Sequence, residues 1–307
     1  MNELAERVRA LQLQGSLNLP LPAGGHTPQR HAALLEFGRM DLSVARLVEA
    51  HTDAVAILAE AGRAGQLNAL YGVWASDGPR SRLTADLLPD GRWCVSGSKQ
   101  YCSGATLLDA ALVTAHSEQG LLLFEIPLHL AGVSILPSTW ASPAFADTAT
   151  VPVSFDAVEL PASALLGDPG WYLTRPGFWH GAIGPAACWA GGALSLIDAA
   201  AALKREDPHS RAHIGALAAL AWGCRAILNE SGREIDADPH DSNVARLRAL
   251  KVRHLIERWC TETLDRFGRA TGPQLLAFDD RAVRQHAALT VYIRQCHAER
   301  DLEAIAA

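Results

Sequence analysis

The residues best suited to chemistry lie in one glycine- and serine-rich stretch, residues 97–104, which reads Gly-Ser-Lys-Gln-Tyr-Cys-Ser-Gly. A β-type run precedes it and a more apolar run follows at 110–115, so the pattern predicts two strands joined as a hairpin. Side chains two residues apart in a strand share a face. Tyr101 and Ser103 would therefore offer one flat ring and one hydroxyl to the same ligand. The same pattern also fits a hairpin that binds nothing.

Length and composition describe a folded protein. The 307 residues are 49% hydrophobic and 20% charged, with a formal net charge of −6. This length allows two or three domains with cores of their own. The acidic balance favours neither nucleic acid nor an anionic membrane as a partner. The apolar run 186–202 contains Asp198 and is followed by charged residues, so we expect a buried helix and no membrane span.

The cysteines and histidines indicate no metal site. The six cysteines show no Cys-x-x-Cys or other ligand spacing, and the twelve histidines are scattered along the chain. The sequence starts without a signal peptide. We therefore expect free thiols and a cytoplasmic protein.

Hydrophobic periodicity divides the chain into three parts. Residues 1–69 predict a small helical part, in which Asp41 or Ser43 caps a helix with an apolar stripe. Residues 70–167 contain seven short strand patterns and predict a compact β-barrel or sandwich. Residues 168–307 predict an antiparallel four-helix bundle. The strand patterns, separated by turn residues such as Pro79 and Gly91, cover 70–75, 83–88, 92–97, 110–115, 120–126, 133–136 and 150–158, and the long helices cover 177–205, 210–234, 242–266 and 278–307.

The order of these parts, together with two segments, resembles the acyl-CoA dehydrogenase family, whose members are flavoenzymes. Residues 97–104 are similar to the family's G-x-K-x-x-I-(T/S) hairpin, and residues 153–167 are similar to its v-x-F-d-x-V-x-V-P…L-G strand. The resemblance covers the chain from about Asp41 to the end. It implies a multi-domain α and β fold with a shortened helical N-terminal domain, a small β-barrel middle domain and a C-terminal four-helix bundle.

The resemblance also implies a set of FAD contacts. Tyr101 stands where the family has an aromatic residue near the isoalloxazine ring, and Ser103 where a hydroxyl bonds to the ring near N5. Backbone groups of Val73 and Trp74 would meet the pyrimidine edge, and the Trp74 side chain would either contact the ligand or pack in the core. Arg205 would contact the FAD diphosphate of a neighbouring subunit, although the family's Phe-Gly pair does not follow it.

The resemblance leaves the catalytic base unassigned. The family removes the α-proton of an acyl thioester with a carboxylate while a hydride passes to the flavin. Most members carry this carboxylate near the C-terminus, after a tyrosine. Here Tyr292 matches, but Ile293 stands at the glutamate position. The alternative position in the first bundle helix, residues 178–184, holds no carboxylate either.

Three other side chains have open roles. His180 could act as an acid or base near neutral pH, or could bond the backbone as a histidine at a helix start. Glu299 and Asp301 could carry a proton, or could form surface ion pairs with Arg294 and Arg300 at helical spacing.

Three functions are open at this point. The first is an FAD-dependent, acyl-CoA dehydrogenase-like oxidoreductase that acts on acyl-CoA or another acyl thioester and forms a homo-oligomer. The second is a non-catalytic structural or partner subunit, in a hetero-oligomer with a homologous chain. The third is a flavin-dependent oxygenase relative, which needs no carboxylate at the family's position. The retained stretch 97–104 favours the first and third functions, whereas the missing carboxylate favours the second and third.

Overall fold

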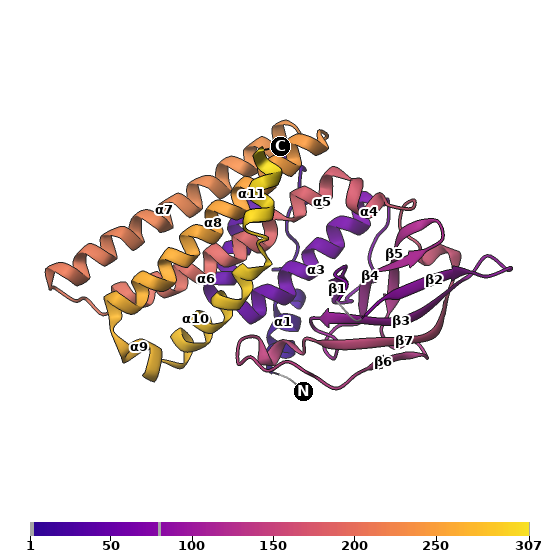
Figure 1. Cartoon of the computed structure of the whole chain (residues 1–307), viewed down its shortest axis with the longest axis horizontal. Helices are drawn as coiled ribbons and strands as arrows, with labels where there is room; N and C mark the ends of the chain where they lie inside the picture. The colour runs from indigo at the N-terminus through magenta and orange to yellow at the C-terminus, as the bar shows by residue number, and fades with distance from the viewer. Residues whose placement is uncertain (1–2, 79–80, 307) are drawn as a thin grey trace. The chain divides into compact units, whose positions relative to one another are not determined.

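The computed structural model describes residues 3–78 and 81–306, and the backbone forms two compact units (Figure 1). The turn predicted at Pro79 lies outside the described residues. Each unit combines two separate stretches of the chain, so neither unit is one continuous piece of sequence. The stretches are Met1–Asn18 with Ala50–Phe178 in unit 1, and Leu19–Glu49 with Trp179–Ala307 in unit 2.

One helix belongs to both units. Helix α3 (Leu42–Glu60) is capped by Asp41, whose carboxylate accepts a hydrogen bond from the Ser43 N–H at 2.8 Å. The turns of α3 up to Glu49 are part of unit 2, and those from Ala50 onward are part of unit 1. The division into three domains, with borders after residues 69 and 167, stays a prediction.

Unit 1 contains a seven-stranded sheet, and its strands follow the seven predicted patterns closely. Turn residues separate the strands, as in the Asp90-Gly91 pair, where Gly91 has a φ of 83°. The strands are β1 (Tyr71–Trp74), β2 (Leu83–Leu87), β3 (Trp93–Cys102), β4 (Ala110–Ser117), β5 (Gly120–Pro127), β6 (Val133–Ile135) and β7 (Val151–Leu160); the helices of unit 1 besides α3 are α1 (Glu3–Leu13), η1 (Ala146–Thr148), η2 (Ala162–Ala164), α4 (Trp171–Thr174) and the start of α5 (Pro176–Gly181).

The strand order corrects one expectation. The sheet runs β1-β4-β2-β3-β7-β6, and β5 also pairs with β4. The predicted hairpin between β3 and β4 is therefore wrong, because β3 pairs with β2 and β7 instead. Strand β4 is buried from Ala110 through Thr114 on both faces, which suits a central strand paired with β1 in parallel and with β5 in antiparallel direction.

Apolar side chains on the sheet form the core of unit 1. Trp93 and Phe124 meet edge to face with their ring centres 5.5 Å apart, and Phe155 packs in the same cluster. A second cluster joins Ile57 and Leu58 of α3 to β1, β4 and β5. The stripe predicted for this helix is thus buried, and it holds the first strand of the sheet against α3.

Unit 2 is helical. Aspartates cap three of its helices: Asp207, Asp241 and Asp279 each accept a hydrogen bond from an N–H of the first turn. The last predicted helix, 278–307, is interrupted near Ala298, whose φ is 48°. The helices are α2 (Thr27–Met40), the end of α5, α6 (Ile183–Ala202), α7 (Pro208–Ala237), α8 (Ser242–Thr271), α9 (Pro273–Phe278), α10 (Asp280–Tyr292), η3 (Ile293–Gln295) and α11 (Glu299–Ala306).

Helix α6 forms the centre of unit 2 and contacts α2, α7, α8 and α10. Small residues allow the closest approach, because a Cβ on Gly191 would lie 2.0 Å from the Leu35 carbonyl oxygen of α2. The segment Pro176–Ala202 is long and apolar enough to span a membrane, yet 78% of its most apolar window is buried inside the protein. The structure therefore confirms a buried helix here.

Candidate functional site

Strand β1 leaves one backbone edge without a strand partner. The Leu70 carbonyl accepts a hydrogen bond from the Ala110 N–H at 3.3 Å, and Gly72 is paired with Ala111 in the parallel ladder. Because backbone groups alternate along a strand, the N–H and C=O of Val73 face away from β4. Among the described strands, β1 pairs with β4 only. Val73 therefore offers one donor and one acceptor at an open edge.

Trp74, the last residue of β1, is hydrogen-bonded to Ser103. The Trp74 indole is 3% exposed and packs in the core, and its Nε1–H donates to the Ser103 carbonyl at 3.2 Å. A Cβ on Gly72 would lie 2.9 Å from Trp74 Nε1, so glycine is needed there. Core packing is confirmed for the Trp74 side chain. The backbone N–H and C=O of Trp74 point toward β4, because backbone groups alternate along the strand. Of the two predicted backbone contacts, Val73 is therefore better placed than Trp74 to bind a ligand.

The Ser103 hydroxyl is buried and connected to a second loop. Its Oγ accepts a hydrogen bond from Thr150 Oγ1 at 3.0 Å, and Thr150 Oγ1 lies 2.8 Å from Thr148 Oγ1. Within the described residues, no hydrogen bond uses the proton of Ser103 Oγ itself. A serine hydroxyl carries one proton and two acceptor positions, so Ser103 keeps a donor for a ligand.

Tyr101 occupies an irregular point of β3. The β3–β7 ladder shifts register between Lys99 and Cys102, and Tyr101 has a φ of 56° with 53% of its surface exposed. Side chains therefore do not alternate regularly between the two faces in this segment. The prediction that Tyr101 and Ser103 share a face, which depends on that alternation, is wrong. Instead, the segment forms a tight turn, in which the Ser103 N–H donates to the Tyr101 carbonyl at 3.0 Å.

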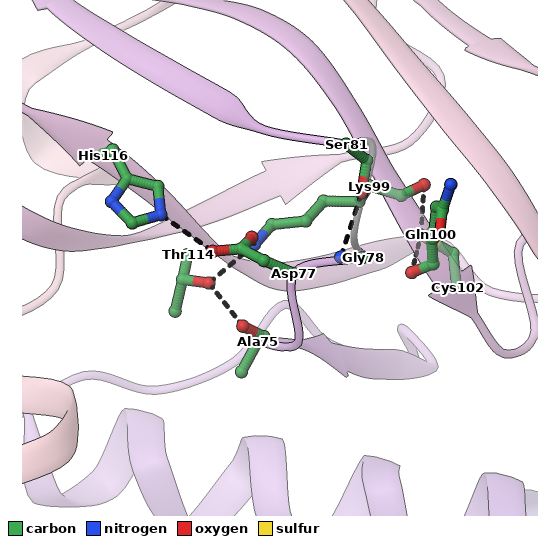
Figure 2. Close-up of polar contacts among 9 residues, drawn as sticks. All are labelled: Ala75, Asp77, Gly78, Ser81, Lys99, Gln100, Cys102, Thr114 and His116. Carbon is green, nitrogen blue, oxygen red and sulfur yellow. Dashed lines mark hydrogen bonds and ion pairs between the residues drawn. The ribbon is translucent and has the colours of Figure 1, made fainter.

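A buried lysine fixes the loop that follows β1 (Figure 2). Lys99 is fully buried, and its Nζ donates to Asp77 Oδ1 at 2.5 Å and to Thr114 Oγ1 at 2.9 Å. Thr114 in turn donates to the Ala75 carbonyl at 2.9 Å. His116 Nε2 lies 2.7 Å from the other carboxylate oxygen of Asp77. The aspartate thus receives contacts from two strands, β3 and β4, and holds the loop between β1 and β2 against them.

The environment of Asp77 favours its charged form. Partial burial by itself raises the pKa of this carboxyl, but the hydrogen bonds and charges of Lys99 and His116 outweigh burial and hold the pKa below its ordinary value. Asp77 therefore stays ionised at neutral pH. Its side-chain partners among the described residues are Lys99 and His116, so Asp77 is a structural carboxylate and no candidate base.

Hydrogen bonds of Tyr71, the first residue of β1, hold the strand in place. The Tyr71 hydroxyl donates to Glu125 Oε1 at 2.7 Å and accepts from the Gln66 N–H at 2.6 Å. The Tyr71 N–H donates to His51 Nδ1 at 3.2 Å. Burial lowers the pKa of His51 to about 4, since the charged imidazolium would be desolvated and Arg9 also opposes it. His51 is therefore neutral and accepts the hydrogen bond of the Tyr71 N–H. Tyr71 lies on the same edge of β1 as Val73, two residues earlier, so His51 covers the edge at Tyr71 and leaves it open at Val73.

The predicted residues of unit 2 have backbone partners. Arg205 follows α6 and donates through Nη2 to the Thr271 carbonyl at 2.7 Å. His180 is buried in α5 and its Nε2 donates to the Pro239 carbonyl at 3.0 Å. The backbone bond expected of His180 is thus confirmed, but the expected position at a helix start is wrong, because His180 lies in the last turn of the short helix α5. The role of Arg205 at a diphosphate stays a prediction.

The C-terminal carboxylates do not form the predicted ion pairs. Arg294 pairs with Glu257 of α8 at 2.5 Å. Asp301 is buried and accepts from the His297 N–H at 3.1 Å, so it caps the turn that starts α11. Glu299 is exposed. Among residues 3–78 and 81–306, no group of three or more His, Cys, Asp or Glu side chains is arranged to hold a metal ion.

Sequence reasoning missed the anchor and the hydroxyl pair. Lys99 is a charged residue at a buried position of an alternating strand, and that mismatch is the signal that could have revealed it. Thr150 was assigned only to the start of a strand. Its contact with Ser103 spans 47 residues of sequence, which no local pattern encodes.

No protein-family model matches the chain, and no curated protein matches it. Several solved structures are similar to it over almost its whole length. KijD3 in complex with FMN and dTDP-3-amino-2,3,6-trideoxy-4-keto-3-methyl-D-glucose has a TM-score of 0.85 and 18% identity, covering 98% of this chain and 85% of that one. FMN-bound TdsC from Paenibacillus sp. A11-2 has a TM-score of 0.81 and 19% identity, covering 99% and 94%.

The methanesulfinate monooxygenase MsuC from Pseudomonas fluorescens has a TM-score of 0.77 and 18% identity, and the match covers 99% of this chain and 94% of that one. Similarity at this level of identity defines the fold. This chain therefore shares its fold with KijD3, TdsC and MsuC. The expected combination of a sheet with a helical C-terminal region is thereby confirmed, while the β-barrel and the four-helix bundle stay predictions.

Proposed function

We propose that this protein is a flavin-dependent oxidoreductase of the monooxygenase type. Two observations support the proposal: the open edge of β1 at Val73, and the unused donor of Ser103, a residue whose carbonyl accepts from the side chain of the neighbouring Trp74. These groups complement the edge of an isoalloxazine ring, which carries carbonyl acceptors, an N3–H donor and an acceptor at N5. Tyr101, two residues before Ser103 in the chain, has an exposed ring on which a flavin could pack.

The residues of unit 1 have distinct tasks in this proposal. Val73 orients the pyrimidine edge, Ser103 donates to the ring near N5, and Tyr101 packs on the ring and excludes water. The Lys99–Asp77 contact fixes the start of the loop that follows β1. A bound flavin supplies the redox chemistry, as a hydride acceptor or, once reduced, as the group that activates dioxygen.

Missing carboxylates favour oxygenation over dehydrogenation. Ile293, at the family's glutamate position, is 1% exposed and apolar, and Asp301 is used as a helix cap. An acyl thioester cannot lose its α-proton without a base. The similar structures include a methanesulfinate monooxygenase and the dibenzothiophene monooxygenase TdsC, and oxygenation needs no base at that position.

Acyl thioester dehydrogenation is the second candidate, favoured by the retained segment 97–104. FAD is the cofactor proposed from that resemblance, with Arg205 near its diphosphate. FMN is the alternative, and KijD3 and TdsC were solved with it. We further propose a cytoplasmic homo-oligomer or a hetero-oligomer with a homologous chain. In this proposal the sheet of unit 1 is the family's β-barrel, and the long helices of unit 2 are its four-helix bundle.

Two measurements test the function. Purified protein is titrated with FMN and, separately, with FAD, and binding is followed by flavin fluorescence and the visible absorption band. We expect one of the two to bind, and failure of both would support the non-catalytic partner subunit instead. Flavin-loaded protein is then mixed anaerobically with a panel of acyl-CoA thioesters, where bleaching of the visible band would show dehydrogenation.

Oxygenation is measured in the same preparation. Chemically reduced, flavin-loaded protein is exposed to isotopically labelled dioxygen together with aromatic, organosulfur and amino compounds. We expect the label in a product and no bleaching by any acyl-CoA. Bleaching without label in any product would assign the protein to the dehydrogenases.

A further inference from the structure

The strongest unassigned feature is the short chain of hydroxyls that ends at Ser103. Thr150 Oγ1 donates to Ser103 Oγ at 3.0 Å, and Thr148 Oγ1 lies 2.8 Å from Thr150 Oγ1 and donates to the Phe145 carbonyl at 2.8 Å. Thr148 is fully buried and Ser103 is 7% exposed. Three hydroxyls thus run from the interior of the loop before β7 to the edge of the candidate site.

The bond from Thr150 Oγ1 to Ser103 Oγ gives this chain a direction. Each hydroxyl has one proton and two acceptor positions. Since Thr150 donates its proton to Ser103, it accepts from Thr148, and the single proton of Thr148 is bifurcated between Thr150 Oγ1 and the Phe145 carbonyl. One acceptor position of Ser103 Oγ is filled by Thr150. Its own proton has no partner among the described residues, and it is the group left to face a ligand.

The backbone near the three hydroxyls also has unusual φ angles. Tyr101, Phe145 and Ala149 have φ angles of 56°, 58° and 48°, in the left-handed region that side chains other than glycine rarely adopt. Two backbone hydrogen bonds join the segments, from Gly104 N–H to the Thr148 carbonyl at 2.8 Å and from Ala105 N–H to the Ala149 carbonyl at 3.3 Å. Strained backbone of this kind persists where the surrounding structure holds it, often at functional sites.

We infer that Thr150 is a positioning residue for the bound flavin. By donating to Ser103 Oγ it turns the Ser103 O–H outward, as a donor aimed at an acceptor atom of the oxidised ring. The inference rests on the proposed flavin site and assigns Thr150 an indirect role there, because Thr150 acts only through Ser103.

A double-mutant cycle tests the inference. The variants are Ser103→Ala, Thr150→Val and the double variant, and the readouts are the Kd for oxidised flavin and the shape of its visible band. We expect each single variant to weaken binding by about 3- to 10-fold, the effect of one hydrogen bond. In the Ser103→Ala background, Thr150→Val should change the Kd by less than about 2-fold, because its target hydroxyl is gone.

Two further variants separate positioning from stability. Thr150→Ser keeps the donor and should restore the affinity and the spectrum. Thr84→Val is the matched control, since its hydroxyl bonds the Ser96 carbonyl on an exposed part of the sheet, and it should leave both readouts unchanged. Melting temperatures are measured for all variants to confirm that they fold.

The possible results distinguish a failure of the inference from a failure of the proposed function. Flavin binding that is weakened by Ser103→Ala but not by Thr150→Val would overturn the inference and leave the proposed function standing. Equal losses from Thr150→Val in both backgrounds would also overturn it, because Thr150 would then act independently of Ser103. A wild-type protein that binds neither FMN nor FAD would overturn the proposed function and the inference together.

Discussion

At the scale of single residues, the Lys99–Asp77 contact shows how a buried charge is retained. The Lys99 ammonium has left water entirely, and its compensation consists of one carboxylate oxygen and one threonine hydroxyl. Removing a charge from water costs several kcal/mol, which an opposite charge must offset. The two partners are not equivalent, because Asp77 lies partly at the surface and can be rehydrated, whereas Lys99 cannot.

This asymmetry predicts unequal costs for two substitutions. Asp77→Asn should lower the free energy of unfolding by about 1–3 kcal/mol, because it leaves a buried ammonium without its counter-charge. Lys99→Met should lower it by less than about 1 kcal/mol, since it removes the buried charge itself. Urea unfolding at neutral pH measures both. A larger loss for Lys99→Met would show that the lysine contributes more than its contacts with Asp77 and Thr114 explain.

At the scale of elements, the open edge of β1 can be tested by removing one backbone donor. Val73→Pro deletes an N–H with which none of the described strands pairs, and proline is tolerated at such an edge. We expect flavin affinity to fall by about 10-fold or more, while the melting temperature changes little. Val73→Ala, which keeps the N–H, is the control and should bind flavin nearly as well as the wild type. Equal affinities of the two variants would contradict a backbone contact at Val73.

The packing of α6 on α2 gives a second test at this scale. A Cβ on Gly191 would lie 2.0 Å from the Leu35 carbonyl oxygen and 2.7 Å from the Arg39 N, both backbone atoms that cannot rotate away. Gly191→Ala should therefore destabilise the protein by about 2–3 kcal/mol. Gly215→Ala in α7 is the matched control. A Cβ there meets nothing within 4 Å, so helix propensity alone should stabilise it by up to about 1 kcal/mol.

At the scale of the whole molecule, two buried histidines make stability depend on pH. Burial lowers the pKa of His31 to about 4, from an ordinary value of 6.5, although its bond to the Leu228 carbonyl opposes the shift. His51 is lowered to about 4 for the same reason. The unfolded chain takes up protons below pH 6.5 that the folded protein refuses until about pH 4, so folding stability falls across this window.

Each histidine should account for up to about 3 kcal/mol of this loss. Urea unfolding between pH 8 and pH 4 measures it, and the double variant His31→Gln and His51→Gln should show a clearly shallower decline. Protonation of Asp77 causes a separate loss of folding stability at lower pH. Its pKa is lowered in the folded state, so its contribution is present above the ordinary pKa of a carboxyl and disappears as the pH falls further. An unchanged slope in the double variant would assign the decline to other groups.

Local sequence patterns determined the elements. The seven strands, the Asp41 cap, the breaks before α7 and α8 and the burial of α6 follow from alternation, capping and apolar runs, which act over a few residues. The match of residues 97–104 and 153–167 to a known family was sufficient to indicate the class of fold. It also selected Val73, Tyr101 and Ser103 as candidate contacts.

Tertiary structure decided which strands are neighbours and what each polar side chain bonds. The predicted β3–β4 hairpin is wrong because strand pairing depends on contacts between residues far apart in the chain. The predicted alternation at Tyr101 is wrong because the register shift of β3 against β7 cannot be inferred from the sequence of β3 alone. Lys99 and Asp77 are 22 residues apart, and Ser103 and Thr150 are 47 apart. Hydrogen bonds form between groups that the fold brings within about 3 Å, whatever their distance in sequence. For that reason the anchor and the hydroxyl chain could be recognised only in three dimensions.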